Sequence, residues 1–329
     1  VGLASGIALT IVAQPRGRDD AARPPTPPGV ATTPGEWHVV RTSMRAAPPP
    51  AQPARQPGRA LPPDAGGVRR MPVPILLYHH ITKEAPATTA LAEMTVHPDD
   101  LDAHLSQLAR EGWHVVGLDE VVGALAGDVA LAERAIALTF DDGWRDQLDH
   151  ALPILRRHRA KATFLITTEG PDAGWVGSMS WAQVRALQAE GMTIGAHTRT
   201  HRDLRALSDA ELVDELDGVA DAIEANAGVR PRIVAYPYGL YDERVLAAAA
   251  AAGYRAGLGV DPDGPASSDR LLELPRITVR GACRGGAAFV DCVGPWLDAA
   301  AAAWDALADA PATTRRDDVA GSLTATDTE

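Results

Sequence analysis

The chain has 329 residues, of which 46% are hydrophobic, and a formal net charge of −12 at pH 7. This length and apolar fraction suffice for one α/β barrel with a buried core and additional terminal segments. Nucleic-acid-binding proteins usually carry a clustered positive face, which the acidic composition argues against, so we expect no nucleic-acid partner. A neutral or cationic glycan would meet no electrostatic penalty.

Residues 1–13 are apolar and carry no charge. A membrane-spanning helix needs about 20 apolar residues, whereas the apolar part of a secretion signal is shorter. We therefore expect a signal or membrane-anchor remnant, and a protein that is extracellular or tethered in the cell envelope. Residues 14–70 are rich in Pro, Ala and Arg without periodicity, which predicts a disordered linker, and residues 311–329 predict a disordered tail.

Residues 71–310 alternate between apolar and amphipathic segments and are predicted to form a single catalytic domain. Short apolar runs predict strands at 73–78, 135–140, 162–167, 192–196, 233–236, 254–260 and 274–279. Amphipathic or alanine-rich segments predict helices at 98–111, 181–190, 209–225 and 242–252. Repeated strand–helix units of this length imply a parallel sheet, closed or doubly wound.

Polar residues follow three of these strands, where functional side chains of α/β folds gather. Asp141 and Asp142 follow the second strand, His197 and His201 the fourth, and Tyr238 the fifth. Two histidines four residues apart can face the same way on one helical turn. Together with one carboxylate they supply three ligands of a catalytic zinc site, and a second carboxylate can act as general base. Taken singly, two adjacent aspartates are usually a solvated turn, surface histidines fall into this spacing by chance, and the segment around Tyr238 is merely a turn.

The chain resembles the polysaccharide deacetylase family (carbohydrate esterase family 4, the NodB-homology domain). The resemblance lies in Thr-Phe-Asp-Asp-Gly at 139–143, His-Thr-Arg-Thr-His at 197–201 and Tyr-Pro-Tyr-Gly at 236–239, and it extends from about residue 72 to residue 279. Leu-Leu-Tyr-His at 76–79 and Leu-Pro-Arg at 274–276 are similar to the branch that includes poly-N-acetylglucosamine deacetylases. The resemblance implies a distorted (β/α) barrel that removes N-acetyl groups from a polysaccharide containing N-acetylglucosamine.

The resemblance also implies a role for each matching residue. Asp142, His197 and His201 would bind a divalent metal ion, with zinc as the expected ion. Asp141 would be the general base, and the backbone N–H of Tyr238 would donate to the oxyanion of the tetrahedral intermediate. A prearranged donor and a cation stabilise such a charge by several kcal/mol.

The chain departs from the family pattern at two positions. No histidine follows His201, so the late Leu-x-His acid of many relatives is absent from the sequence. We expect His79 to protonate the leaving amine instead, with His80 as the weaker alternative and a structural role for His79 as the other. Ala235 stands where many relatives carry an arginine that orients the base. Arg276 either reaches the same carboxylate or forms an ordinary surface ion pair.

Several features keep more than one interpretation. The same site would serve an O-acetyl esterase, and an inactive glycan-binding domain would have lost the base or a metal ligand, all of which this sequence retains. The polymer is poly-N-acetylglucosamine, peptidoglycan or a chitin-like chain, and the sequence does not indicate an oligomeric state. Trp144, Trp175 and Trp181 either stack on sugar rings or fill the core. Cys283 and Cys292 either form a disulfide or stay free. Residues 261–263 are predicted to form a loop.

Overall fold

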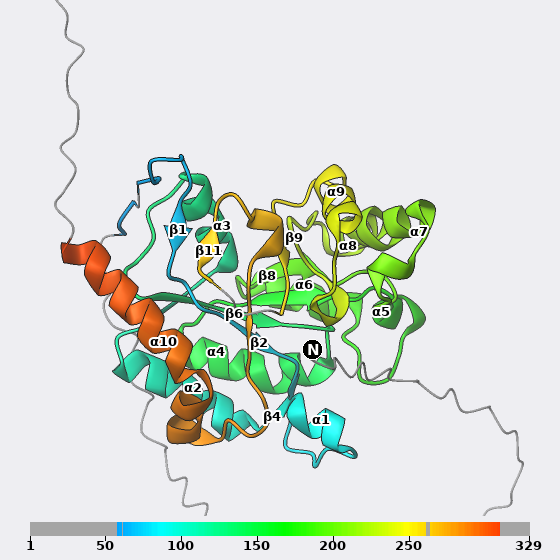
Figure 1. Ribbon diagram of the computed structural model, residues 1–329. Coiled ribbons are helices and arrows are strands. Elements are labelled where there is room, and N and C mark those ends of the chain that lie inside the picture. Colours follow the sequence, from blue (N-terminus) through cyan, green and yellow to red (C-terminus); the bar gives the residue numbers. More distant parts are fainter. Residues whose placement is uncertain (1–57, 61, 261–263, 310–329) are drawn as a thin grey trace, which may run out of the picture. The chain divides into compact units, whose positions relative to one another are not determined.

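The computed structural model describes residues 58–60, 62–260 and 264–309 (Figure 1). The expected signal segment, the expected linker up to residue 57, residue 61, the predicted loop at 261–263 and the expected tail lie outside these residues. Within the described ranges, no helix is both long and apolar enough to cross a membrane.

The centre of the fold is a sheet of eight parallel strands in the order β10-β9-β8-β7-β6-β2-β12, with β5 paired to the first half of β6. Almost every residue of these strands is buried, as expected for a parallel sheet covered on both faces. The strands are β2 Ile75–Tyr78, β5 His114–Val116, β6 Ala135–Phe140, β7 Thr163–Ile166, β8 Thr193–Ala196, β9 Ile233–Ala235, β10 Ala256–Leu258 and β12 Ile277–Thr278.

One stretch of chain joins the two edges of the curled sheet. Leu274 forms a parallel bridge with Leu258 of β10, and β12, which follows closely, pairs in parallel with β2. The predicted (β/α) barrel is therefore confirmed. It is distorted because this joining stretch, which we call the seam (residues 274–278), consists of one bridge followed by a two-residue strand.

Helices lie on both sides of the sheet, with α2, α4 and α10 on one side in Figure 1. Helix α10 packs against α2, α2 against α4, and α6 against α8 and β8. The α-helices are α1 Thr89–Glu93, α2 Pro98–Arg110, α3 Leu118–Ala126, α4 Leu152–His158, α5 Glu169–Ala173, α6 Trp181–Ala189, α7 Asp209–Val213, α8 Val219–Ala227, α9 Glu243–Ala251 and α10 Gly285–Asp309.

Short elements complete the described chain. Two small sheets pair β1 Arg70–Met71 with β11 Ala266–Ser267 and β3 His80–Ile81 with β4 Thr95–Val96. The 3₁₀ turns are η2 Leu204–Ala206, η4 Pro237–Gly239 and η5 Leu271–Glu273, and the π-helical turns are η1 Gln147–Ala151 and η3 Asp214–Gly218.

Helix α2 shows how the sequence specifies an element. Pro98 occupies the first turn, where its missing N–H costs nothing, and the ring of His97 accepts a hydrogen bond from a backbone N–H of that turn. Leu101, Leu105 and Leu108 are all buried on one face, as the helical spacing predicts. The predicted helix at 98–111 is confirmed to within one residue.

Two expectations about the fold need correction, and one helix was not predicted. The helix predicted at 209–225 is divided into α7 and α8 by the π-helical turn η3, which buries Glu215. The linker was expected to extend to residue 70, but Arg59 pairs with Leu131 and β1 pairs with β11. Such pairing depends on partners far along the chain, which composition does not reveal. The long helix α10 contains Pro295 and was not predicted.

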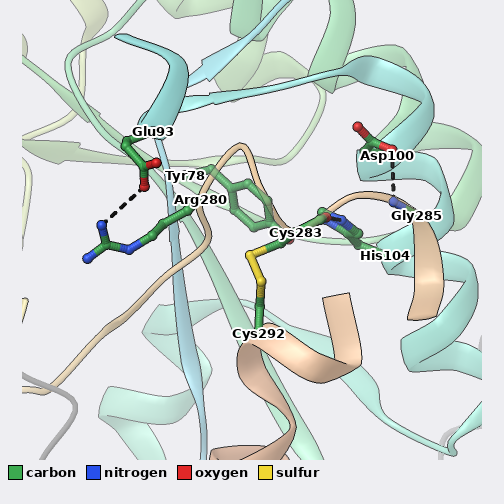
Figure 2. Close-up of a disulfide and its surroundings, with 8 residues drawn as sticks. All are labelled: Tyr78, Glu93, Asp100, His104, Arg280, Cys283, Gly285 and Cys292. Carbon is green, nitrogen blue, oxygen red and sulfur yellow. Dashed lines mark hydrogen bonds and ion pairs between the residues drawn. A yellow bond between two sulfur atoms is a disulfide. The ribbon is translucent and has the colours of Figure 1, made fainter. Parts of the chain in front are cut away.

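Cys283 and Cys292 form a disulfide at the start of α10, which resolves the two alternatives for these thiols (Figure 2). The Nε2–H of the buried His104 donates to the Cys283 carbonyl at 2.5 Å, and the Tyr78 hydroxyl donates to its Nδ1 at 3.3 Å. Burial lowers the pKa of His104 to about 4, so the ring is neutral at pH 7 and these partners fix its tautomer. His104 therefore links the disulfide loop to Tyr78. Tyr78 is the last residue of β2 and directly precedes His79.

Candidate active site

Three side chains at the strand ends converge on one point. Asp142, His197 and His201 each offer one ligand atom, and these atoms lie within 4.8 Å of one another. The Nε2 atoms of His197 and His201 are 3.4 and 3.6 Å from the same oxygen, Oδ1 of Asp142. We call these three residues the ligand cluster. The sequence predicts them as metal ligands, and the structure places them within reach of a single ion.

The orientation of His197 fits a metal ligand. Its Nδ1 lies 2.8 Å from the carbonyl oxygen of Ala235, at the end of β9, so Nδ1 carries the proton and donates to that carbonyl. Nε2 then presents its lone pair toward Asp142. Metal-binding histidines are usually held by such a bond from the second ring nitrogen, and two imidazoles with one carboxylate are a set that zinc accepts.

The charges of the ligand cluster also favour a cation. Burial alone would lower the pKa of His197, but the carboxylates of Asp141 and Asp142 raise it above its usual value. Burial and the neighbouring His197 lower the pKa of His201 to about 4, so this ring is neutral at pH 7. Burial would raise the pKa of Asp142, yet the bond to His197 and the nearby imidazoles lower it. A divalent ion can therefore replace the proton that His197 attracts.

A buried ion pair lies beside the ligand cluster. The guanidinium of Arg276 donates to both carboxylate oxygens of Asp141, at 2.7 and 2.8 Å. Its Nε donates to the Gly259 carbonyl at 2.8 Å, and both charged side chains are almost fully buried. Of the two alternatives for Arg276, the surface ion pair is wrong and the contact with Asp141 is observed. Arg276 lies in the seam. The position in β9 at which many relatives carry an arginine is occupied by Ala235.

Asp141 keeps its charge despite its burial. Burial would raise the pKa of its carboxyl group, but the charges of Arg276 and His197 and the bonds from Arg276 lower it below its ordinary range. Its Oδ2 lies 3.6 Å from Nε2 of His197, at the edge of the ligand cluster. The structure thus holds the ionised carboxylate of Asp141 next to the three ligand atoms, but this carboxylate is bound to Arg276.

The segment that carries the two histidines is not helical, so the expected helical turn is wrong. Thr198 and His201 have positive φ values of 64° and 56°, whereas residues of a right-handed helix have negative φ. Glu215, only 1% exposed, accepts hydrogen bonds from the backbone N–H groups of Arg199 at 2.8 Å and Thr200 at 3.0 Å and from the Thr200 hydroxyl. This buried carboxylate, which the sequence analysis missed, fixes the loop between the two rings.

His79 and His80 have different surroundings. Nδ1 of His79 is buried and has no hydrogen-bond partner among the described residues. Burial lowers the pKa of His79, while the negative charges of Asp142 and Asp141 oppose this effect. Nδ1 of His80 instead lies 2.7 Å from a carboxylate oxygen of Asp146. Of the two histidines, His79 is thus the one whose Nδ1 has no partner among the described residues, and its role as the acid remains a prediction.

Gln147 ties the ends of β2 and β6 together. Its side-chain amide donates to the carbonyl oxygens of His79 at 3.0 Å and Asp141 at 2.6 Å. This fully buried glutamine begins the π-helical turn η1. It fixes the separation of the candidate acid and the candidate base, and no feature of the sequence singles it out.

Tyr238 stands at the rim of the site, in the turn η4. Its φ is 61° and its side chain is 51% exposed, with its ring edge-on to that of His201 at 4.8 Å between centroids. Gly239 follows with φ 70°, and a side chain there would overlap Val260. This turn places the ring of Tyr238 against His201 of the ligand cluster, and the role of the Tyr238 backbone N–H as oxyanion donor remains a prediction.

The three tryptophans are used differently. The indole N–H of Trp144 donates to Oδ2 of Asp142 at 2.9 Å, and that of Trp181 donates to Asp172 at 3.0 Å. Trp175 is 46% exposed. Of these three residues, for which stacking on a sugar and a place in the core were the alternatives, Trp175 is the most exposed.

A curled parallel barrel with two imidazoles and two adjacent carboxylates at its strand ends is an arrangement that metal-assisted hydrolysis can use. Residues 128–257 match the family model described as polysaccharide deacetylase. The solved structure of the Streptococcus pyogenes deacetylase PplD in complex with acetate is 30% identical to this chain, with a TM-score of 0.62 over 67% of this chain and 97% of that one. The chain belongs to the polysaccharide deacetylase family and is a hydrolytic enzyme.

Two curated relatives extend the comparison. The putative polysaccharide deacetylase YxkH of Bacillus subtilis is 26% identical over 215 residues, which are 65% of this chain and 74% of that protein. The chitooligosaccharide deacetylase of a Bradyrhizobium strain is 36% identical over 139 residues, which are 41% of this chain and 60% of that protein. The second match thus spans less than two thirds of the relative.

Proposed function

We propose that this protein hydrolyses N-acetyl groups of a polysaccharide containing N-acetylglucosamine and releases acetate, using a divalent metal ion, expected to be zinc. The observation that carries the proposal is the convergence of Asp142, His197 and His201 beside the ionised Asp141. The relative that acts on chitooligosaccharides supports an N-acetylglucosamine substrate. The motifs at 76–79 and 274–276 support poly-N-acetylglucosamine as the first polymer to test.

Asp142, His197 and His201 would hold the ion, which when bound supplies positive charge to the reacting carbonyl oxygen and makes a water molecule more acidic. Asp141 takes a proton from the attacking water, while Arg276 keeps its carboxylate in place. The backbone N–H of Tyr238 donates to the oxyanion.

The C–N bond then breaks, and the amine needs a proton as it leaves. His79 is neutral at pH 7 because burial lowers its pKa. It must therefore take up a proton before it donates one. The proton that Asp141 has taken from water is the source within the site, and its transfer to His79 leaves Asp141 ionised again. Water and amide are thus converted to acetate and amine, with no net change in the enzyme.

The proposal also places the protein outside the cytosol, in the cell envelope or tethered to a membrane. The apolar residues 1–13 and the disulfide between Cys283 and Cys292 support this, since disulfides persist mainly in oxidising compartments. An acetylated wall or matrix polymer would be accessible there.

Acetate release by the full chain tests the proposal. Poly-N-acetylglucosamine, peptidoglycan and chitin oligomers would each be incubated with zinc-loaded protein, with chelator-treated protein and with treated protein to which zinc is returned. We expect acetate from at least one polymer, its loss on chelation and its recovery with zinc. Acetate release that survives complete metal removal would refute the metal's role, and polymer binding without acetate release would favour the inactive glycan-binding alternative.

His79→Ala separates amide from ester hydrolysis. We expect kcat/KM on an N-acetyl substrate to fall by about 10²–10⁴, the usual contribution of a general acid. The same variant should lose much less on an O-acetyl substrate, because an alcohol leaves more readily than an amine. Equal losses on both substrates, at an unchanged unfolding temperature, would count against His79 as the acid.

A further inference from the structure

The two oxygens of the Asp142 carboxylate have different partners. Oδ1 faces Nε2 of His197 and of His201, at 3.4 and 3.6 Å. Oδ2 accepts a hydrogen bond from the indole N–H of Trp144 at 2.9 Å. One oxygen therefore belongs to the ligand cluster, while the other is held by a donor outside it.

The backbone around this carboxylate is fixed as well. Asp142 has a φ of 76°, and its carbonyl accepts a hydrogen bond from the Thr167 hydroxyl at 3.0 Å. Trp144, two residues later, forms an antiparallel bridge with Ser178. Both ends of the Trp144–Asp142 hydrogen bond are thus attached to restrained backbone.

The ring of Trp144 is itself held in place. It stacks on the ring of His80, with centroids 4.6 Å apart and an interplanar angle of 27°. Nδ1 of His80 lies 2.7 Å from one oxygen of Asp146, whose other oxygen accepts the backbone N–H of Ile81 at 3.2 Å. A chain of contacts thus runs from Asp146 through His80 and Trp144 to Asp142.

We infer that Trp144 is a positioning residue that makes Asp142 bind metal through one oxygen only, and that His80 and Asp146 hold its ring for this purpose. The inference rests on the metal-dependent function proposed above. Without the indole donor the carboxylate is free to rotate, so Oδ1 is no longer held toward the two imidazoles, and Oδ2 can occupy the position that water needs. Hydrogen-bonded groups behind metal ligands typically contribute 10–100-fold to metal affinity.

Trp144→Phe tests the inference, because the phenyl ring can still stack on His80 but has no N–H to donate to Asp142. We expect the zinc dissociation constant, measured by isothermal titration calorimetry, to rise by about 10–100-fold. The matched control is Trp181→Phe, which makes the same chemical change at an indole bonded to Asp172. This control should bind zinc as the wild type does.

The absorption spectrum of cobalt-loaded protein provides a second readout, because it reports the number of ligands. We expect Trp144→Phe, but not Trp181→Phe, to change the visible bands. His80→Ala keeps the indole donor but removes its support, so its loss of zinc affinity should be smaller than that of Trp144→Phe.

Two outcomes would overturn the inference in different ways. If wild-type protein binds zinc and Trp144→Phe matches it in affinity and cobalt spectrum, the positioning role is wrong and the proposed function stands. If wild-type protein binds no divalent ion, the proposed function and the inference fail together.

Discussion

The Asp141→Asn variant is expected to release acetate about 10²–10⁴ times more slowly than the wild type, the range usual for loss of a general base. An amide of nearly the same size cannot take a proton from water. Because Asp142, His197 and His201 are unchanged, the variant should still bind zinc. The measurement is kcat on an N-acetyl substrate together with the zinc dissociation constant.

Stability must be followed in the same experiment, because Asp141 is also paired with the buried Arg276. The asparagine oxygen can accept one of the two guanidinium bonds but not both, so the free energy of unfolding should fall. Rates are therefore compared per folded molecule. Asp172→Asn, which changes a carboxylate bonded to Trp181, is the control and should keep the wild-type rate. An Asp141→Asn protein that is folded and retains most of its activity would exclude Asp141 as the base.

Arg276→Met is expected to lower the free energy of unfolding by about 3–5 kcal/mol at neutral pH, the usual cost of leaving one partner of a buried ion pair alone. In the wild type the pKa of Asp141 is lowered in the folded state. The stabilisation from this group is therefore present above the unfolded pKa of about 4 and is lost as the pH falls through the folded value.

The same variant should reverse the sign of this pH dependence. Without the guanidinium, burial raises the pKa of Asp141, so the destabilisation is largest at high pH and shrinks as the pH falls and the carboxyl takes up a proton. The acidic limb of kcat/KM should also move to higher pH. Urea unfolding and kcat/KM between about pH 5 and pH 8 measure both effects. Arg270→Met, at an exposed pair with Glu273, should change stability by less than about 1 kcal/mol. An unchanged pH profile in Arg276→Met would contradict the argument.

The sequence was sufficient to predict which polar residues lie at the ends of the strands. Apolar runs predicted β6 and β8, and Asp142, His197 and His201 follow from where those strands end. The spacing of the two histidines suggested a helical turn, but a spacing of four is equally met by a loop with two positive φ values. That choice depends on Glu215, whose contact with the loop arises only in the folded chain.

Residues that support the site could not be predicted, because their importance lies in contacts between distant segments. Gln147 bonds two strand ends, and Trp144 bonds a carboxylate that the sequence already implicated for another reason. For Arg276 the sequence left two alternatives, and only the geometry of the seam decides between them. The unpredicted helix α10 has few charged residues along its length, so its pattern resembled no amphipathic helix.

The seam has a consequence for biosynthesis. When residue 273 has been added to the nascent polypeptide, every other residue proposed for the chemistry has been synthesised, but Arg276 has not. Until that guanidinium arrives, Asp141 lacks the buried cation that donates to both of its oxygens, and the barrel is open between β10 and β2. Completion of the barrel and pairing of the proposed base with Arg276 are therefore a single late event, and a chain interrupted before it should be inert toward acetylated polymer.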